Sequence, residues 1–258
     1  MDIIDSYNKL TLAQYQEIQA VQKDESLEDI DKHTRILSIL TGMPEDELMH
    51  LPITEYTELS AKARFLTAEG FQAGRMAKKY IIGGMELVPV SDFRKLETAQ
   101  YIDFQTYAGD LDKYMAELIS VLLVPKGHRY NEGYDIIELQ GHIRQEMSVA
   151  DGATIVGFFF DLVREINQGF SELLQADGEG DQGQDGEGED PEEDRGAGDG
   201  FRDKWGWIAN VDAVSETCRC PWDDVFHMTA IEFLNLLCYR KDRAERDKAE
   251  IEQWKRTH

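Results

Sequence analysis

The sequence predicts a mainly α-helical body with a small β-hairpin sheet, a disordered acidic linker and a small helical C-terminal module. Three observations predict this class. Apolar residues recur every three or four positions through most of the chain, which is typical of amphipathic helices. Alternation with a period of two is confined to the neighbourhood of Gly83-Gly84. Residues 177–200 have almost no apolar side chains.

Residues 177–200 are composed almost entirely of glycine, acidic residues and glutamine. They include 8 glycines and 11 acidic residues against one base, Arg195. Such a segment cannot bury enough apolar surface to offset the entropy lost on ordering it. We therefore predict a solvated tether between a body at residues 1–176 and a module at residues 201–258. A glycine-rich chain of this length has a root-mean-square reach of about 25 to 30 Å.

The body is predicted to consist of helices that begin and end at polar, Pro or Gly positions. Ser26 with the acids that follow it predicts a helix start, and Gly42 predicts a left-handed helix end. Pro44 and Pro52 each suit the first turn of a helix. Later helices are expected from near Thr98, from Tyr114 to Pro125, from Asp135 to Met147, and from Ser148 to near Leu174. Ser148 and Asp151 have the spacing of a capping box.

Residues 78–90 are predicted to form a β-hairpin. Tyr80 and Ile82 precede Gly83-Gly84, and Met85, Leu87 and Val90 follow it. A Gly-Gly pair supplies the positive φ angles that a two-residue hairpin turn requires. Because an isolated hairpin is marginally stable, we expect it to pack against the helices.

The C-terminal module is predicted to contain a helix at residues 205–217, a short turn at 221–226, and a helix that begins at a capping box of Thr229 and Glu232. Fewer than 60 residues make a very small core. We therefore expect the module to be ordered by docking, either on the body or on a partner.

Charge and composition restrict the classes of function. The net charge is −24 and the pI about 4.5, which argues against nucleic acid as a partner because phosphate binding depends on clustered Lys and Arg. Protein partners are one explanation of the acidity, and solubility alone is the other.

The longest apolar runs are too short to span a bilayer, and the N-terminus has no signal-peptide pattern, so we expect no membrane association and a cytoplasmic location. All three cysteines lie in the module, and we expect thiols rather than a disulfide framework.

Two groups of residues could support metal or acid–base chemistry. Glu138, His142 and Glu146 are spaced to share one face of a helix, where they could hold a metal or could simply form a solvated surface. Cys218 and Cys220 with His227 and Cys238 form a second group, but their spacing is poor for zinc. Phosphate-binding, dinucleotide-binding and serine-nucleophile motifs are absent from the sequence. We therefore expect no enzyme activity, no metal and no cofactor, with a metal-dependent enzyme as a remote alternative.

The aromatic content of the module is the strongest indication of binding. Aromatic side chains are preferred anchors in protein interfaces, and a unit of this size cannot bury all of those present. Internal packing is the alternative for some of them. We predict partner contacts at Trp222, Phe226, Phe233 and Trp254, and Trp254 is the least suited to a core because its neighbours are charged.

Several stretches resemble a known group of proteins. HTRILSILTGMPEDELMHLPITEYTEL, KKYIIGGMELVPV, TAQYIDFQTY and ELISVLLVPKGHRY, together with PWDDV and AIEFLN in the module, resemble tail assembly chaperones of tailed bacteriophages and prophages, and the related group of T-even-like baseplate or tail assembly proteins. The resemblance covers most of residues 30–165 and about 205–245. It consists of packing patterns and includes no catalytic marker.

The resemblance implies a non-enzymatic function in the bacterial host cytoplasm. A protein of this group would bind the phage tape-measure protein, keep its hydrophobic helices soluble and bring tail-tube protein to it, and it could self-associate. A flexible tether would raise the effective concentration of one client near the other. The main alternative is a structural baseplate or connector subunit that stays in the virion.

Overall fold

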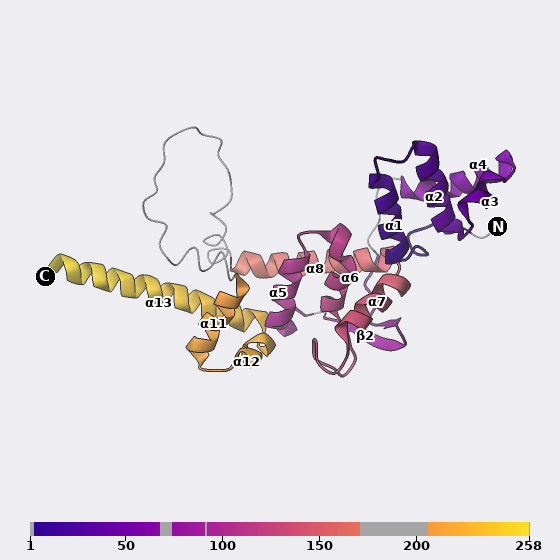
Figure 1. Cartoon of the computed structure of the whole chain (residues 1–258). Coiled ribbons are helices and arrows are strands. Elements are labelled where there is room, and N and C mark those ends of the chain that lie inside the picture. Colours follow the sequence, from indigo (N-terminus) through magenta and orange to yellow (C-terminus); the bar gives the residue numbers. More distant parts are fainter. Residues whose placement is uncertain (1–2, 68–73, 91, 171–205, 258) are drawn as a thin grey trace, which may run out of the picture. The chain divides into compact units, whose positions relative to one another are not determined.

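The computed structural model describes residues 3–67, 74–90, 92–170 and 206–257. The chain is mainly α-helical with a small antiparallel sheet (Figure 1), which confirms the predicted fold class. It divides into unit 1, residues 1–90 and 103–160, and unit 2, residues 91–102 and 161–258. This division differs from the predicted boundaries, because two body segments belong with the C-terminal module. The predicted linker at 177–200 lies outside the described residues.

The N-terminal part of unit 1 is helical. Its elements are α1 (Leu12–Lys23), α2 (Asp29–Thr41), α3 (Glu45–Met49), α4 (Ile53–Lys62) and the 3₁₀ helix η1 (Ala63–Leu66). Gly42 ends α2 with a φ of 71°, as predicted. Ser26 does not begin the helix: its N–H and hydroxyl both donate to the Asp24 carboxylate, so it closes the turn after α1.

The hairpin prediction is confirmed. β1 (Tyr80–Ile82) and β2 (Met85–Pro89) pair antiparallel with Ile82 opposite Met85, and Gly83 and Gly84 have φ angles of 56° and 73°. A further strand, β3 (Leu123–Pro125), pairs with β2 and gives the order β1-β2-β3. The predicted helix through Pro125 therefore ends at Leu122, where the chain joins the sheet.

The remaining helices of unit 1 enclose its core. They are α5 (Thr98–Tyr107), α6 (Leu111–Leu122), α7 (Ile136–Glu146) and α8 (Val149–Gly169), and α5 and α8 contribute residues to both units. Phe104 and Phe159 are buried with ring centroids 6.2 Å apart. A Cβ at Gly152 would lie 3.1 Å from Ile119 and 3.2 Å from Leu12, so a glycine there permits close packing on α8.

In unit 1, α1 and α8 both begin at one short antiparallel β-bridge. The Leu12 N–H donates to the Met147 carbonyl and the Val149 N–H donates to the Leu10 carbonyl. Between these bonds, Thr11 pairs with Ser148. Thr11 forms a capping box with Gln14 on α1, and Ser148 caps α8 through Asp151. Two helices far apart in the sequence are thereby fixed side by side at their N-termini.

Unit 2 repeats this arrangement with α5 and the last helix of the chain. Its C-terminal elements are α11 (Trp207–Cys218), α12 (Trp222–His227) and α13 (Ala230–Thr257), preceded in sequence by the 3₁₀ helix η2 (Phe93–Lys95). The Thr98 N–H donates to the Met228 carbonyl, and the Ala230 N–H donates to the Leu96 carbonyl. Glu97 and Thr229 pair between them. The C-terminal module is thus completed by residues 91–102.

Candidate protein-binding surface

Phe233 lies in the core of unit 2 and is not a surface contact. Its exposed fraction is 0%, and its ring centroid is 6.3 Å from that of Trp207. Trp207 in turn packs edge-on against Tyr101 at 5.7 Å. The Tyr101 hydroxyl donates to Asn167 Oδ1 at 3.0 Å. The proposal that Phe233 contacts a partner directly is therefore corrected, because the helix face that carries it closes this aromatic cluster.

Trp222 and Phe226 lie on α12, at the edge of the same unit. Trp222 is 44% exposed, and its indole N–H donates to Asp212 Oδ1 of α11 at 3.2 Å. Phe226 is half-buried, while its neighbour Val225 is fully buried. The short helix therefore buries Val225 and leaves part of Trp222 available at the surface.

The turn between α11 and α12 contains a disulfide between Cys218 and Cys220. The expectation of thiols was therefore wrong for Cys218 and Cys220. Arg219 adopts the left-handed conformation with a φ of 54°, and this turn brings the two cysteines on either side of it together. Cys238 lies outside this disulfide, and within the described residues no group of three or more His, Cys, Asp and Glu side chains is placed to hold a metal ion.

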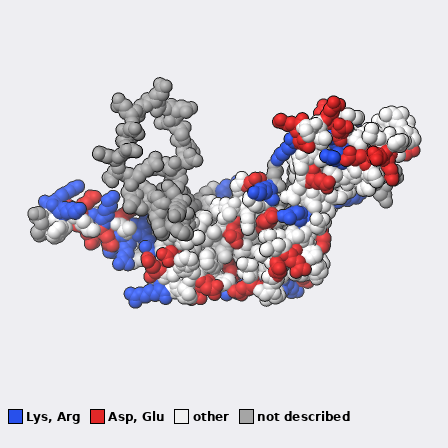
Figure 2. Space-filling view, viewed as in Figure 1, with Lys and Arg blue, Asp and Glu red and all other residues white. Residues whose placement is uncertain are grey.

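Trp254 lies on the outer half of α13. It is 61% exposed, Ile251 is 55% exposed and Tyr239 is 54% exposed. The buried residues of α13 all belong to its first two turns, Ala230, Phe233 and Leu234. From Arg240 to Thr257 the helix has seven basic and five acidic residues, a net charge of +2 in a chain with a total of −24. Figure 2 shows the basic side chains that gather near the C-terminal end.

Sequence reasoning identified Trp254 but missed Ile251, Lys248 and Lys255 on the same helix. These residues lie in a stretch in which charged residues predominate, so no apolar run draws attention to them. The signal that could have found them is the seven-residue spacing of Ala244 with Ile251, and of Lys248 with Lys255, because this spacing returns to the same helix face.

The Glu138, His142 and Glu146 group supports the hairpin of unit 1. The Gly83 N–H donates to Glu146 Oε2 at 2.9 Å, and His142 Nδ1 lies 2.9 Å from Glu146 Oε1. Glu138 is farther away, with its carboxylate 3.8 Å from His142 Nε2. The Gly83 N–H and the imidazole lower the pKa of Glu146. A Cβ at Gly83 would lie 2.6 Å from the His142 ring, so these contacts hold the turn against α7.

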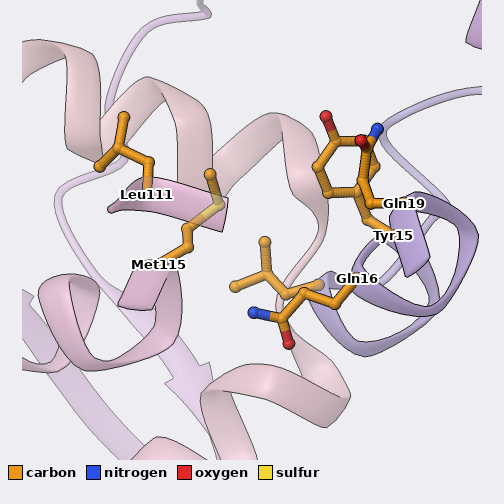
Figure 3. Close-up of a pocket in the computed structure, with 6 residues that line it drawn as sticks. Tyr15, Gln16, Gln19, Leu111 and Met115 are labelled. Carbon is orange, nitrogen blue, oxygen red and sulfur yellow. The ribbon is translucent and has the colours of Figure 1, made fainter. Parts of the chain in front are cut away.

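Two cavities in the described part of unit 1 are small or open. One lies between α1 and α6 (Figure 3) and has a volume of about 10 Å³, room for roughly one water molecule. It is lined by Leu12, Tyr15, Gln16, Gln19, Leu111 and Met115. A wider, open groove beside the end of α2 is lined mainly by aliphatic and backbone groups, with Lys9 as its one charged residue. Neither cavity brings together a nucleophile and a base.

No protein-family model, curated protein or solved structure matches this chain. Among the described helices, none is both long enough and apolar enough to cross a membrane. The candidate surface is therefore identified by geometry alone. It consists of the exposed aromatic and aliphatic side chains of α12 and of the outer half of α13.

Proposed function

We propose that the protein is a tail assembly chaperone of a tailed bacteriophage or prophage. It acts without catalysis in the bacterial host cytoplasm, binding the tape-measure protein and the tail-tube protein during tail morphogenesis. The sequence resemblance is one support. The strongest structural support is the exposure of the outer half of α13. This part of the helix extends past the buried residues of unit 2, and more than half of the surface of Ile251 and of Trp254 is exposed.

This surface suits the transient binding of helical clients. Aromatic anchors supply much of the affinity in protein interfaces, and exposed apolar residues that stand singly on a charged helix are compatible with a soluble free protein. Trp222 on α12 supplies a second exposed aromatic side chain in the same unit. Unit 1 is the candidate site for the other client, and binding two clients with one chain raises the effective concentration of each near the other.

The test is co-expression of the full chain with the tape-measure and tail-tube proteins of the same phage genome. We expect both to co-purify with the chain. Trp254→Ala and Trp222→Ala should each reduce capture of at least one client at least fivefold. Ile137→Ala is the matched control, because Ile137 is a 75% exposed apolar residue of unit 1, and it should leave capture unchanged.

Mass spectrometry of purified particles separates the proposal from the structural alternative. A chaperone should be absent from finished particles or present only in traces. Recovery in a stoichiometric amount would identify a baseplate or connector subunit instead. Deleting residues 201–258 is a poor test, because Leu96, Thr98 and Tyr101, all 0% exposed, would lose the segment that completes unit 2.

A further inference from the structure

The outer half of α13 continues the helix face that forms the core of unit 2. Residues on this face recur at alternating intervals of three and four positions. The series begins with Ala230, Phe233 and Leu237 and continues, with Arg240 and Asp247 as its polar members, through Ala244, Ile251 and Trp254. This is the a/d spacing with which one helix packs along another. The inner part is buried, at 0% exposure for Ala230 and Phe233, whereas Ile251 and Trp254 are 55% and 61% exposed.

The two polar residues of this face, Arg240 and Asp247, form hydrogen bonds or ion pairs with other residues of unit 2. Arg240 donates to the carbonyl of Ala213 on α11, which marks where packing inside unit 2 ends. Asp247 accepts from Arg246 at 2.7 Å and lies 3.8 Å from Arg243. Asp247 therefore forms one polar layer between Ala244 and the Ile251–Trp254 pair, and a polar layer of this kind fixes the register of a helix partner.

One edge of the face is uniformly basic. Lys241, Lys248 and Lys255 recur at seven-residue intervals, so they lie in a row beside the apolar stripe. Lys248 and Lys255 have no ion pair in the described part of the chain. The other edge carries Arg243 and Glu250, and the ion pairs of Arg246 with Asp247 and Glu250 stabilise the helix locally.

The charges argue against a second copy of the chain as the occupant. In an antiparallel pair of these faces the lysine rows would meet each other. In a parallel pair Glu250 would lie favourably near Lys255 of the other copy, but Asp247 would face Asp247 and Lys248 would lie near Arg243, so like charges predominate. Like charges at flanking positions disfavour pairing. A partner with acidic residues at those positions would instead place carboxylates against Lys248 and Lys255.

We infer that residues 240–257 of α13 form a docking face for an amphipathic helix of a client protein, whose apolar stripe is flanked by Asp and Glu. Ile251 and Trp254 supply the apolar contacts, Ala244 permits close approach, and the lysine row selects the acidic partner. The inference deepens the proposed function and rests on it, because it takes the occupant to be a protein client rather than a lipid surface.

The test uses a synthetic peptide of four heptads, with Leu and Ile along its stripe and Glu at every flanking position, labelled with a fluorophore. Repulsion between its glutamates keeps it from pairing with itself. We expect the full chain to raise its fluorescence anisotropy with saturation. A peptide with the same stripe but Lys at the flanking positions should bind at least tenfold more weakly.

Two variants locate the binding on the helix. Trp254→Ala should weaken binding of the Glu peptide at least tenfold. The double variant Lys248→Glu with Lys255→Glu should weaken it further and should reverse the preference toward the Lys peptide. Lys255→Glu and Arg256→Glu make the same single charge change on the docking face and on the opposite face of α13, so Arg256→Glu is the matched control. Far-UV circular dichroism checks that each variant keeps its helix.

Several outcomes would overturn the inference. These are failure of the Glu peptide to bind, equal binding of both peptides, or equal loss with the control variant. Sedimentation equilibrium that showed a dimer abolished by Trp254→Ala would assign the face to a second copy. Flotation with 3:1 phosphatidylcholine and phosphatidylserine vesicles, lost in the same variants, would assign it to a membrane.

The inference and the proposed function fail separately. If the phage clients co-purify with the chain and the peptide does not bind, only the docking face is wrong. If the peptide binds as described but neither client is captured, the face stands and the phage chaperone proposal is wrong.

Discussion

The bridges at which helices begin in units 1 and 2 share one backbone arrangement but differ in their side chains. In unit 1 the inward-facing residues are large and apolar: Leu10, Leu12, Met147 and Val149 are 0 to 5% exposed. In unit 2 the corresponding residues are Leu96, Thr98, Met228 and Ala230, two of which are small. Unit 2 adds a side-chain hydrogen bond, with His227 Nδ1 3.0 Å from Glu97 Oε2 and both side chains less than 20% exposed.

The difference indicates that one backbone geometry can be stabilised in two ways. Unit 1 depends on apolar burial, which is non-directional. Unit 2 depends more on hydrogen bonds and on the pair between Glu97 and His227, so its stability should respond to the loss of single polar groups. The following experiments test this contrast at matched positions.

The largest contrast is expected between Leu12→Ala and Thr98→Ala. Both residues donate their N–H to the opposite strand of the bridge, but Leu12 is a buried leucine, whereas the Thr98 hydroxyl donates to the Met228 carbonyl. Leu12→Ala should lower the free energy of unfolding by about 3 kcal/mol, and Thr98→Ala by about 1 kcal/mol. Urea titration followed by circular dichroism measures both. Equal losses would contradict the contrast.

A double-mutant cycle on Glu97 and His227 should give a coupling energy of about 1 to 2 kcal/mol, because the pair is largely shielded from water. Glu97→Ala, His227→Ala and the double variant are compared by tryptophan fluorescence, which reports unit 2 because all four tryptophans follow residue 204. The His142 and Glu146 pair of unit 1 is the control, with side chains 37% and 44% exposed, and its cycle is followed by circular dichroism because unit 1 has no tryptophan. Its coupling should stay below about 0.5 kcal/mol.

The N-terminal caps of α8 and α13 should contribute equally to the free energy of unfolding. Ser148 accepts from the Asp151 N–H at 3.1 Å, and Thr229 accepts from the Glu232 N–H at 3.2 Å. Ser148→Ala and Thr229→Ala should therefore each cost about 1 kcal/mol. Thermal unfolding of the two variants checks this. A much larger loss for one of them would mean that its cap also supports tertiary packing.

The smallest effect concerns Glu146 and acid pH. The pKa of this carboxylate is lowered in the folded state, chiefly by the Gly83 N–H. Its stabilising contribution is therefore complete above the unfolded pKa of about 4.3 and is lost as the pH falls through the lower folded pKa. Glu146→Gln keeps an acceptor for Gly83 but removes the charge. Stability between pH 5 and pH 3 should fall less steeply in this variant than in the original protein.

Local features of the fold could be predicted from the sequence. The Gly83-Gly84 turn, the helix end at Gly42 and the boxes at Ser148 and Thr229 depend on residues within a few positions of each other. β3 could not be predicted, because Leu123–Pro125 adopts a strand only through its pairing with β2. The bridge of Glu97 with Thr229 joins residues more than 130 positions apart, and no local pattern indicates which segments meet.

The candidate surface was predictable only in part. Trp254 could be identified because charged neighbours make it unsuited to a core. Residue type does not show that Phe233 is buried while Trp254 is exposed, because the burial of Phe233 depends on where Trp207 and Tyr101 lie. The disulfide between Cys218 and Cys220 was missed because it depends on the left-handed conformation of Arg219, which residue type does not indicate.

The bridge between Glu97 and Thr229 has a consequence for synthesis on the ribosome. Thr98 and Met228, which are joined by a backbone hydrogen bond, are separated by 130 positions. At about 5 to 20 residues per second, the N-terminal strand of this bridge is made roughly 7 to 26 s before its partner. During that time Leu96 and Tyr101 lack the residues that bury them in the finished fold, so unit 2 closes after unit 1 and stays open to capture by chaperones for longer.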